Sequence, residues 1–487
     1  MAGEEAISEL EEAAPSSMSS SRKPDASRNR LLCLMKVLFF LQSWSPSGML
    51  RTGSLYLLDR GMTVAQIGQI EAAGLFLPAL TSPLWGLLAD RLRRRKAVSL
   101  GLMVISIALL ALLAMPQIGC MHCFWRLMAL MTALSVFNLG GTVDAYTLDF
   151  LGEAHKGEYG VYRLWGSVGW ATSAISAGIV AEHAGFVYNF PVYGAAAVAM
   201  LLLCAFLLPA RTASEHSPME GREMELYVLM RGLRHWRVLV ALAEVLILGV
   251  GVGVAEKLIF AYVVRELGGS PSLCGYGVAC MSLTNVPLFF FSNRLLRYMG
   301  RDWMFALAVA AYTLRAIAYT LLTRHTVYLF LPIEFLHGVT YSLSRAATVD
   351  FIQAALPAAW LTTGQQILLV TGQQGIGGGL GALAGGWYMS QHGGKQTYTL
   401  AAVASSVLLG FHVVSCSVLW LCRRSTLLSL PHERRQRSFP AFSTAQAAEP
   451  LVSDSNCHHG SVQTSTEAYV AEGADTGQHE QRVGRTS

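Results

Sequence analysis

Charged residues are scarce in this chain. Only 14% of its 487 residues are Asp, Glu, Lys or Arg, and 53% are hydrophobic, whereas soluble domains carry about 25% charge. The mean hydropathy is +0.42. Apolar runs of about 20 residues, the length that crosses a bilayer as a helix, recur between Leu31 and Leu421. A single soluble core cannot absorb so many runs, so the lack of charge excludes an ordinary soluble protein.

Motifs for catalysis, nucleotide binding and metal binding are also lacking. The chain has no phosphate-cradling P-loop, which disfavours a pump driven directly by nucleotide. No paired catalytic arrangement or metal cage is evident, so we expect no enzyme, no metal and no cofactor. The nine cysteines are scattered and imply no disulfide framework. Cys120 and Cys123 have the spacing of a metal or redox pair, but a local disulfide or two free thiols is the stronger interpretation, because no second ligand pair lies nearby.

The apolar segments predict an all-α integral membrane protein with twelve transmembrane helices. A largely polar stretch, 211–236, predicts a cytosolic central loop between two pseudo-symmetric six-helix bundles at 31–210 and 237–422. The polar ends, 1–30 and 423–487, predict disordered cytosolic tails. The expected spans lie at about 33–58, 64–88, 98–116, 125–148, 161–182, 191–209, 237–262, 271–292, 302–322, 327–349, 363–389 and 397–421.

Basic residues fix the expected orientation. The net charge is +5, and the excess Lys and Arg cluster in short loops between spans. Loops on one side hold roughly 20 of them against roughly 5 on the other, which predicts that both termini are cytosolic. Topology explains this charge better than a nucleic-acid partner does. We expect a monomer in the lipid bilayer, with the plasma membrane slightly favoured over an organelle membrane.

The strongest local motif follows the second expected span and reads Gly86-Leu87-Leu88-Ala89-Asp90-Arg91-Leu92-Arg93-Arg94-Arg95-Lys96. It resembles the major facilitator loop motif G-x-L-A-D-R-x-G-R-R, with Arg93 in place of the second glycine. The resemblance implies that Asp90, Arg91 and Arg94 latch the two bundles on the cytosolic side in one alternating state, and Gly86 permits close helix contact. Alternatively, the basic residues only hold the loop inside.

Two further segments, 159–169 and 336–338, are similar to a branch of this superfamily that includes lactose permease and proton-coupled nucleoside symporters. The similarity covers almost all of residues 31–422. It implies a secondary transporter whose two bundles rock about a central site. It does not identify a cargo, since one fold serves many functions. The fifth expected span lacks the Gly-Pro pair of drug antiporters, so antiport is less favoured.

The tenth expected span carries polar side chains at intervals of three or four residues, which places them on one helical face: Glu334, His337, Tyr341, Ser344 and Thr348. Arg315 of the ninth span reaches a similar depth, so we expect one network of Arg315, Glu334 and His337. Lactose permease similarly places Arg, His and Glu of these spans at its coupling site, with the order of His and Glu reversed. Such a set can carry a proton. A structural ion pair and simple substrate contact are the alternatives.

Other polar residues in the apolar segments predict further contacts. Arg51 and Glu71 lie at similar depth and are expected partners, as a structural pair or a substrate site. Asp144 and Arg163 predict a charge pair at the cytosolic ends of the fourth and fifth spans, either a gate or an interfacial salt bridge.

Neighbouring charges and amides complete the candidate site. Glu256 and Lys257 project about 100° apart on one helix, so we expect at most one of them to line the transport path. The candidate lining includes five neutral amides, which can bind a solute or tie helices together: Gln42, Asn138, Asn285, Gln366 and Gln373. The eleventh span is dense in glycine, which favours close packing and bending.

Together these features predict a secondary active transporter of a small polar solute, with proton symport as the sharper form. Sugars or nucleosides are favoured only through the resemblance. A facilitative uniporter is the alternative within the class, and a non-transporting membrane sensor or scaffold is the alternative outside it. Costly buried charges argue against the scaffold, which has no need of them.

Overall fold

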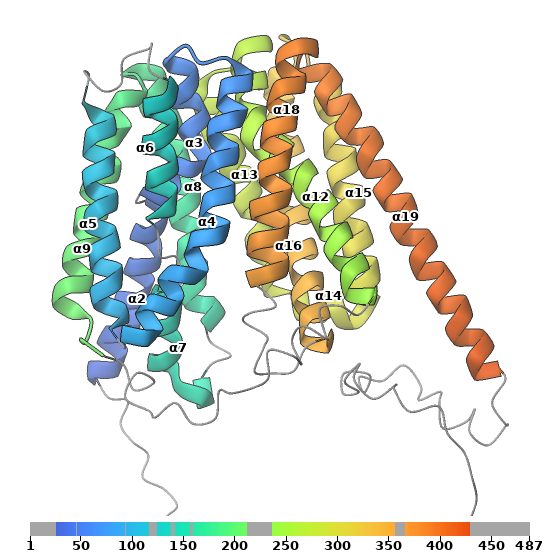
Figure 1. Cartoon of the computed structure of the whole chain (residues 1–487), viewed down its shortest axis with the longest axis horizontal. Helices are drawn as coiled ribbons and strands as arrows, with labels where there is room; N and C mark the ends of the chain where they lie inside the picture. The colour runs from blue at the N-terminus through green and yellow to red at the C-terminus, as the bar shows by residue number, and fades with distance from the viewer. Residues whose placement is uncertain are drawn as a thin grey trace, which may run out of the picture. The chain divides into compact units, whose positions relative to one another are not determined.

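Helices make up the regular structure of the computed structural model, which describes residues 26–44, 46–92, 94–115, 124–137, 142–155, 159–211, 236–355 and 366–428. The helices of the first half are α2 (Ala26–Trp44), α3 (Pro46–Asp59), α4 (Val64–Leu92), α5 (Arg95–Ala114), α6 (Phe124–Val136), α7 (Thr142–His155), α8 (Tyr159–His183), η2 (Phe186–Tyr188) and α9 (Asn189–Leu207) (Figure 1). Those of the second half are α12 (Trp236–Ala261), η3 (Tyr262–Glu266), α13 (Pro271–Phe290), α14 (Ser292–Met299), α15 (Arg301–Thr320), η4 (Val327–Leu329), α16 (Phe330–Ala355), η6 (Gln366–Gly377), α18 (Gly378–His392) and α19 (Gly394–Leu428).

Eight helical segments among the described residues are long and apolar enough to cross a membrane: Arg95–Ala114, Tyr159–His183, Phe186–Leu207, Val238–Glu266, Pro271–Phe290, Arg301–Thr320, Ile367–His392 and Gly394–Ser417. Each of them matches an expected span. The expected spans 64–88 and 327–349 correspond to α4 and α16, which are long helices with ionisable residues inside them. The first and fourth expected spans each correspond to two helices, α2 with α3 and α6 with α7. The total of twelve spans stays a prediction.

Two ends of the helical body can be distinguished. We call the end where α2 begins and α19 ends the terminal end, and the opposite end, where α3 ends and α4 begins, the far end (Figure 1). Among the described residues, helices of the two halves pack together in five pairs of elements: α8 with α13, α4 with α18, α4 with η6, α3 with α12, and α4 with α12. The loop that connects α3 to α4, between Asp59 and Val64, lies at the far end.

Glycines allow the two halves to approach closely at the far end. A Cβ atom on Gly68 of α4 would lie 2.4 Å from the carbonyl oxygen of Ala382 in α18. A Cβ on Gly275 of α13 would lie 2.4 Å from the carbonyl oxygen of Ala174 in α8. Any side chain larger than hydrogen would therefore push these backbones apart, as in other membrane interfaces that rely on small residues.

The apolar core is shared by the halves only towards the far end, among the residues that the structure describes. There one cluster combines residues of both halves, including Tyr56 of α3, Leu258 of α12 and Tyr319 of α15. Nearer the terminal end the core consists of separate clusters. One, around Phe39, belongs to the first half, and another, around Phe305, belongs to the second. The far end is thus packed shut across the two halves.

Candidate functional site

A fully buried ion pair joins α15 to α16. The Arg315 guanidinium donates to Glu334 from Nη2, at 3.2 Å from Oε1 and 3.4 Å from Oε2. Tyr319 completes the group, because its hydroxyl accepts from Arg315 Nε at 2.6 Å and donates to Glu334. Both charged side chains have essentially no exposed surface. Burying such charges is costly unless they are paired and hydrogen-bonded, and here each one is. The predicted contact of Arg315 with Glu334 is therefore present.

His337 has a carboxylate partner that the sequence analysis did not assign to it. Its Nε2 lies 3.2 Å from Oε1 of Glu256 in α12. The ring also stacks on Tyr341 one turn later, with centroids 6.4 Å apart. The Glu256 side chain is 26% exposed, whereas Glu334 is fully buried. The polar face of α16 thus carries a fully buried ion pair at Glu334 and, one turn later, a contact of His337 with a partly exposed carboxylate.

The next residue of α12 forms an ion pair across the two halves. Lys257 Nζ lies 2.7 Å from Oε2 of Glu71 in α4, with the side chains 12% and 8% exposed. Glu71 thus contacts α12, although Arg51 was its expected partner; the Arg51 side chain lies outside the described residues. Glu256 and Lys257 point to different helices, as their spacing predicts. Neighbouring residues of α12 therefore connect the His337 pair to the contact between the halves.

A second polar contact between the halves joins α8 to α13 at the far end. The Glu182 carboxylate, in the last turn of α8, accepts a hydrogen bond of 3.1 Å from the backbone N–H of Ser272. Ser272 is in the first turn of α13, where backbone N–H groups lack helical partners. A carboxylate of one half therefore caps a helix of the other half.

The candidate amides are only partly described. Asn285 is buried in α13 and its Oδ1 accepts from the Ser342 hydroxyl of α16 at 3.0 Å, so it ties two helices of the same half together. Gln373 is buried in η6, and Gln42 is half-buried in α2. Asn138 and the side chain of Gln366 lie outside the described residues. The glycine-rich eleventh span begins with η6, which is π-helical, and π-helical turns often mark functional sites.

At the terminal end, the predicted pair of Asp144 and Arg163 is present. Arg163 Nε lies 3.6 Å from Asp144 Oδ1, and the Tyr159 hydroxyl donates to the same carboxylate. The side chains are 30% and 53% exposed, and all three residues belong to the first half. The contact therefore has the features of an interfacial salt bridge, and a gating role remains a prediction.

The predicted cytosolic latch is not tested by the structure. The surroundings of Gly86 and the side chains of Asp90 and Arg91 lie outside the described residues, and Arg94 is exposed just before α5. The neighbouring Arg95 lies 3.9 Å from Asp149 of α7, within the same half. The latch therefore remains an expectation from the motif.

The sequence analysis named neither member of a further buried ionisable pair, which the structure describes. In the second half, His412 of α19 lies with Nδ1 3.0 Å from Glu244 Oε1 in α12 and with Nε2 3.0 Å from the backbone oxygen of Asp302. Both side chains are largely buried. A carboxylate and an imidazole inside long apolar runs were the available signal, because such groups are costly in a membrane. The pair ties α19 to α12 and α15 and lies within one half.

Comparison with known proteins assigns the chain to a family. A model of the MFS_1 like family matches residues 32–400, more than half of the chain. The chain belongs to this family of major facilitator transporters. It is therefore an integral, multi-pass membrane transporter and not an enzyme, as the sequence predicted.

The individual proteins that this chain resembles share a quarter or less of its sequence. The maltose permease of Geobacillus stearothermophilus is 25% identical over 346 residues, which cover 69% of this chain and 82% of the permease. The crystal structure of the nucleoside transporter NupG superposes with a TM-score of 0.65 at 15% identity, over 80% of this chain and 99% of that one. A structure of the peptide transporter POT gives 0.63 at 12% identity, over 80% and 94%. At such identities the structures show that the fold is shared, and they do not identify a cargo.

Proposed function

We propose that this facilitator carries a small polar solute together with protons across a membrane by alternating access. In this proposal two six-helix bundles, with twelve spans and cytosolic termini, rock about a central site. The terminal end then faces the cytosol. The far end, packed shut by the shared core, faces the opposite side, and the chain has the inward-facing arrangement. The positive-inside rule supports this orientation, and we favour the plasma membrane.

The observation that carries the proposal is the pair of neighbouring contacts on α12. Glu256 touches His337 at 3.2 Å, and Lys257 touches Glu71 of the other half at 2.7 Å. Histidine changes its charge near neutral pH, and a carboxylate contact is stronger with the charged ring. Proton binding at His337 therefore alters the electrostatics one residue away from the ion pair that joins the halves. We propose that this adjacency couples the proton to closure of the far end.

The difference in exposure between the two pairs on α16 favours His337 over Glu334 as the coupling group. Glu334 accepts hydrogen bonds from both Arg315 and Tyr319 and is fully buried, which suits a fixed tie between α15 and α16. Glu256 keeps a quarter of its surface exposed, so water or solute can reach it. We therefore assign proton coupling to His337 and Glu256 and a structural role to Arg315 and Glu334.

The nature of the cargo is proposed from relatives. One relative is named a maltose permease and one structural neighbour is named a nucleoside transporter. Solutes rich in hydroxyl groups are therefore the first to test. Among the described polar groups, Glu256, Gln373 and Gln42 are the ones we propose to contact such a solute, because amides and carboxylates bind hydroxyl groups.

The test is uptake of labelled sugars and nucleosides by cells that express the wild type, His337→Gln or the matched control His325→Gln. His325 is an exposed residue of the far-end loop after α15. The wild type and the control should accumulate one of these solutes under an inward proton gradient, and His337→Gln should only equilibrate it. Accumulation by His337→Gln equal to that of wild type would refute the coupling role. Gradient-independent equilibration by the wild type would indicate a uniporter, and no uptake by a surface-exposed wild type would indicate a sensor or scaffold.

A further inference from the structure

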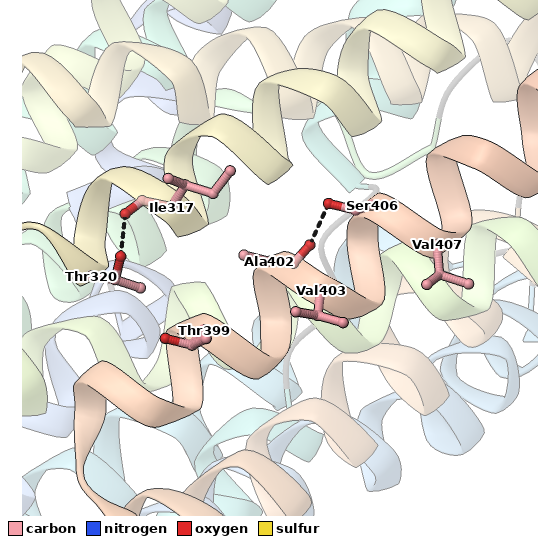
Figure 2. Close-up of a pocket in the computed structure, with 7 residues that line it drawn as sticks. All are labelled: Ile317, Thr320, Thr399, Ala402, Val403, Ser406 and Val407. Atoms are coloured by element: carbon pink, nitrogen blue, oxygen red, sulfur yellow. Dashed lines mark hydrogen bonds between the residues drawn. The ribbon is translucent and has the colours of Figure 1, made fainter.

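A groove of about 480 Å³ runs between α15 and α19 and shares no lining residue with the ion pairs described above. It is lined by Ile317 and Thr320 of α15 and by Thr399, Ala402, Val403, Ser406 and Val407 of α19 (Figure 2). Ile317, Val403 and Val407 are all exposed, at 44%, 57% and 68%. In a transporter of this fold, such an exposed apolar surface faces the hydrocarbon of the bilayer.

The hydroxyl groups that line the groove have no free proton to donate to a polar solute, among the described residues. Thr320 donates to the carbonyl of Ile317 at 2.7 Å, and Ser406 donates to that of Ala402 at 2.8 Å (Figure 2). Thr399 donates to the carbonyl of Lys395 at 2.9 Å. Each hydroxyl therefore donates its proton to a backbone carbonyl of its own helix. The lining presents methyl and methylene groups outward, which matches a hydrocarbon chain rather than a sugar.

Two cations lie where the groove reaches the far end. Lys395 is one turn before Thr399 and so lies on the groove-facing side of α19. Arg324 lies four residues after Thr320, just beyond the end of α15. Glu266 brings the two segments together, because its backbone oxygen accepts from Arg324 Nε at 3.3 Å and its carboxylate accepts from the Gly394 N–H at 2.8 Å. Arg324 and Lys395 are both exposed.

We propose that this groove binds one glycerophospholipid of the far leaflet, with an acyl chain along α19 and the phosphate between Arg324 and Lys395. The apolar lining accounts for the chain, and the two cations at the level of the headgroups account for the phosphate. The Glu266 carboxylate is engaged by the first turn of α19, where both of its oxygens accept from the Gly394 N–H. It is therefore not fully available to neutralise the two cations in place of a phosphate. A phospholipid fits both parts of the surface, whereas a sterol or diacylglycerol would leave the cations unused.

The test is native mass spectrometry of the full chain, purified in mild detergent and titrated with phosphatidylcholine, with diacylglycerol of the same chains, or with cholesterol. Val403→Trp fills the groove, and Val198→Trp is its control on α9, where the residue is also exposed. The double variant Arg324→Gln with Lys395→Gln removes the cations, and Arg294→Gln with Arg297→Gln on exposed surface of α14 is its control.

Wild type and both controls should retain one phosphatidylcholine. Val403→Trp should lose it, and the Arg324 and Lys395 variant should bind it about tenfold more weakly. Equal retention by Val403→Trp would overturn the site. If wild type retained diacylglycerol or cholesterol as well as it retains phosphatidylcholine, recognition of the phosphate would be overturned. A dimer that Val403→Trp disrupts would identify a second copy of the chain as the occupant of the groove instead. None of these results depends on transport.

Discussion

Replacing Lys257 by methionine should open the far end of the protein. The substitution keeps a long unbranched side chain but leaves the Glu71 carboxylate, which is 8% exposed, without the ammonium that lies 2.7 Å away. Removing one partner of a buried ion pair costs about 3–5 kcal/mol. In a far-open state water can solvate Glu71, so most of this cost falls on the sealed state. A shift of about 3 kcal/mol changes the ratio of the two states by about a hundredfold.

The assay for this shift is thiol labelling from the far side. A reporter cysteine replaces Ile67, which is fully buried in the core cluster shared by the halves, in a background without other reactive cysteines. A membrane-impermeant maleimide should label it slowly in the wild type and much faster with Lys257→Met. Adding Glu71→Gln should return labelling towards the wild-type rate, since replacing both members of a buried pair is often nearly neutral.

A matched control is the pair of Arg301 and Asp350, which lies at 3.6 Å within the second half near the terminal end. Arg301→Gln should leave labelling unchanged, because this pair does not join the halves. Unchanged labelling in a well-expressed Lys257→Met protein would refute the inference that the Glu71 pair holds the far end closed.

Further predictions concern packing and stability. Glu334→Gln should lower the free energy of unfolding by about 3 kcal/mol, because it leaves the fully buried Arg315 cation without its carboxylate. The melting temperature in detergent measures this loss, and an unaltered melting temperature would contradict the structural role. Gly68→Ala should speed the same thiol labelling, because the new Cβ would lie 2.4 Å from the Ala382 carbonyl. Gly194→Ala, whose new Cβ would meet no other helix or side chain within 4 Å, is the control and should have no effect.

Contacts between helices adjacent in the chain could be predicted from the sequence. Arg315 with Glu334 and Asp144 with Arg163 lie on consecutive spans, and depth along each span was enough to pair them. The positions of the long apolar helices also followed from composition, because about 20 apolar residues have few alternatives to a span.

Contacts between distant helices could not be predicted in this way. Glu71 with Lys257, and Glu256 with His337, join elements far apart in the chain. Periodicity gives the face of a helix and the approximate depth of a residue, but it does not say which non-consecutive helix packs there. The pairing of Glu244 with His412 was missed for the same reason. The element η6 is π-helical and packs against α4 and α12, and the glycine pattern alone specifies neither its form nor its neighbours.

Solute-driven proton movement tests the central claim most directly. Purified protein is reconstituted in liposomes that contain a pH-sensitive dye, and a transported sugar or nucleoside is added outside without any imposed gradient. Symport predicts that the interior acidifies as the solute enters, and that His337→Gln abolishes the acidification while solute still equilibrates. Entry of solute into wild-type liposomes with no change in internal pH would contradict proton coupling.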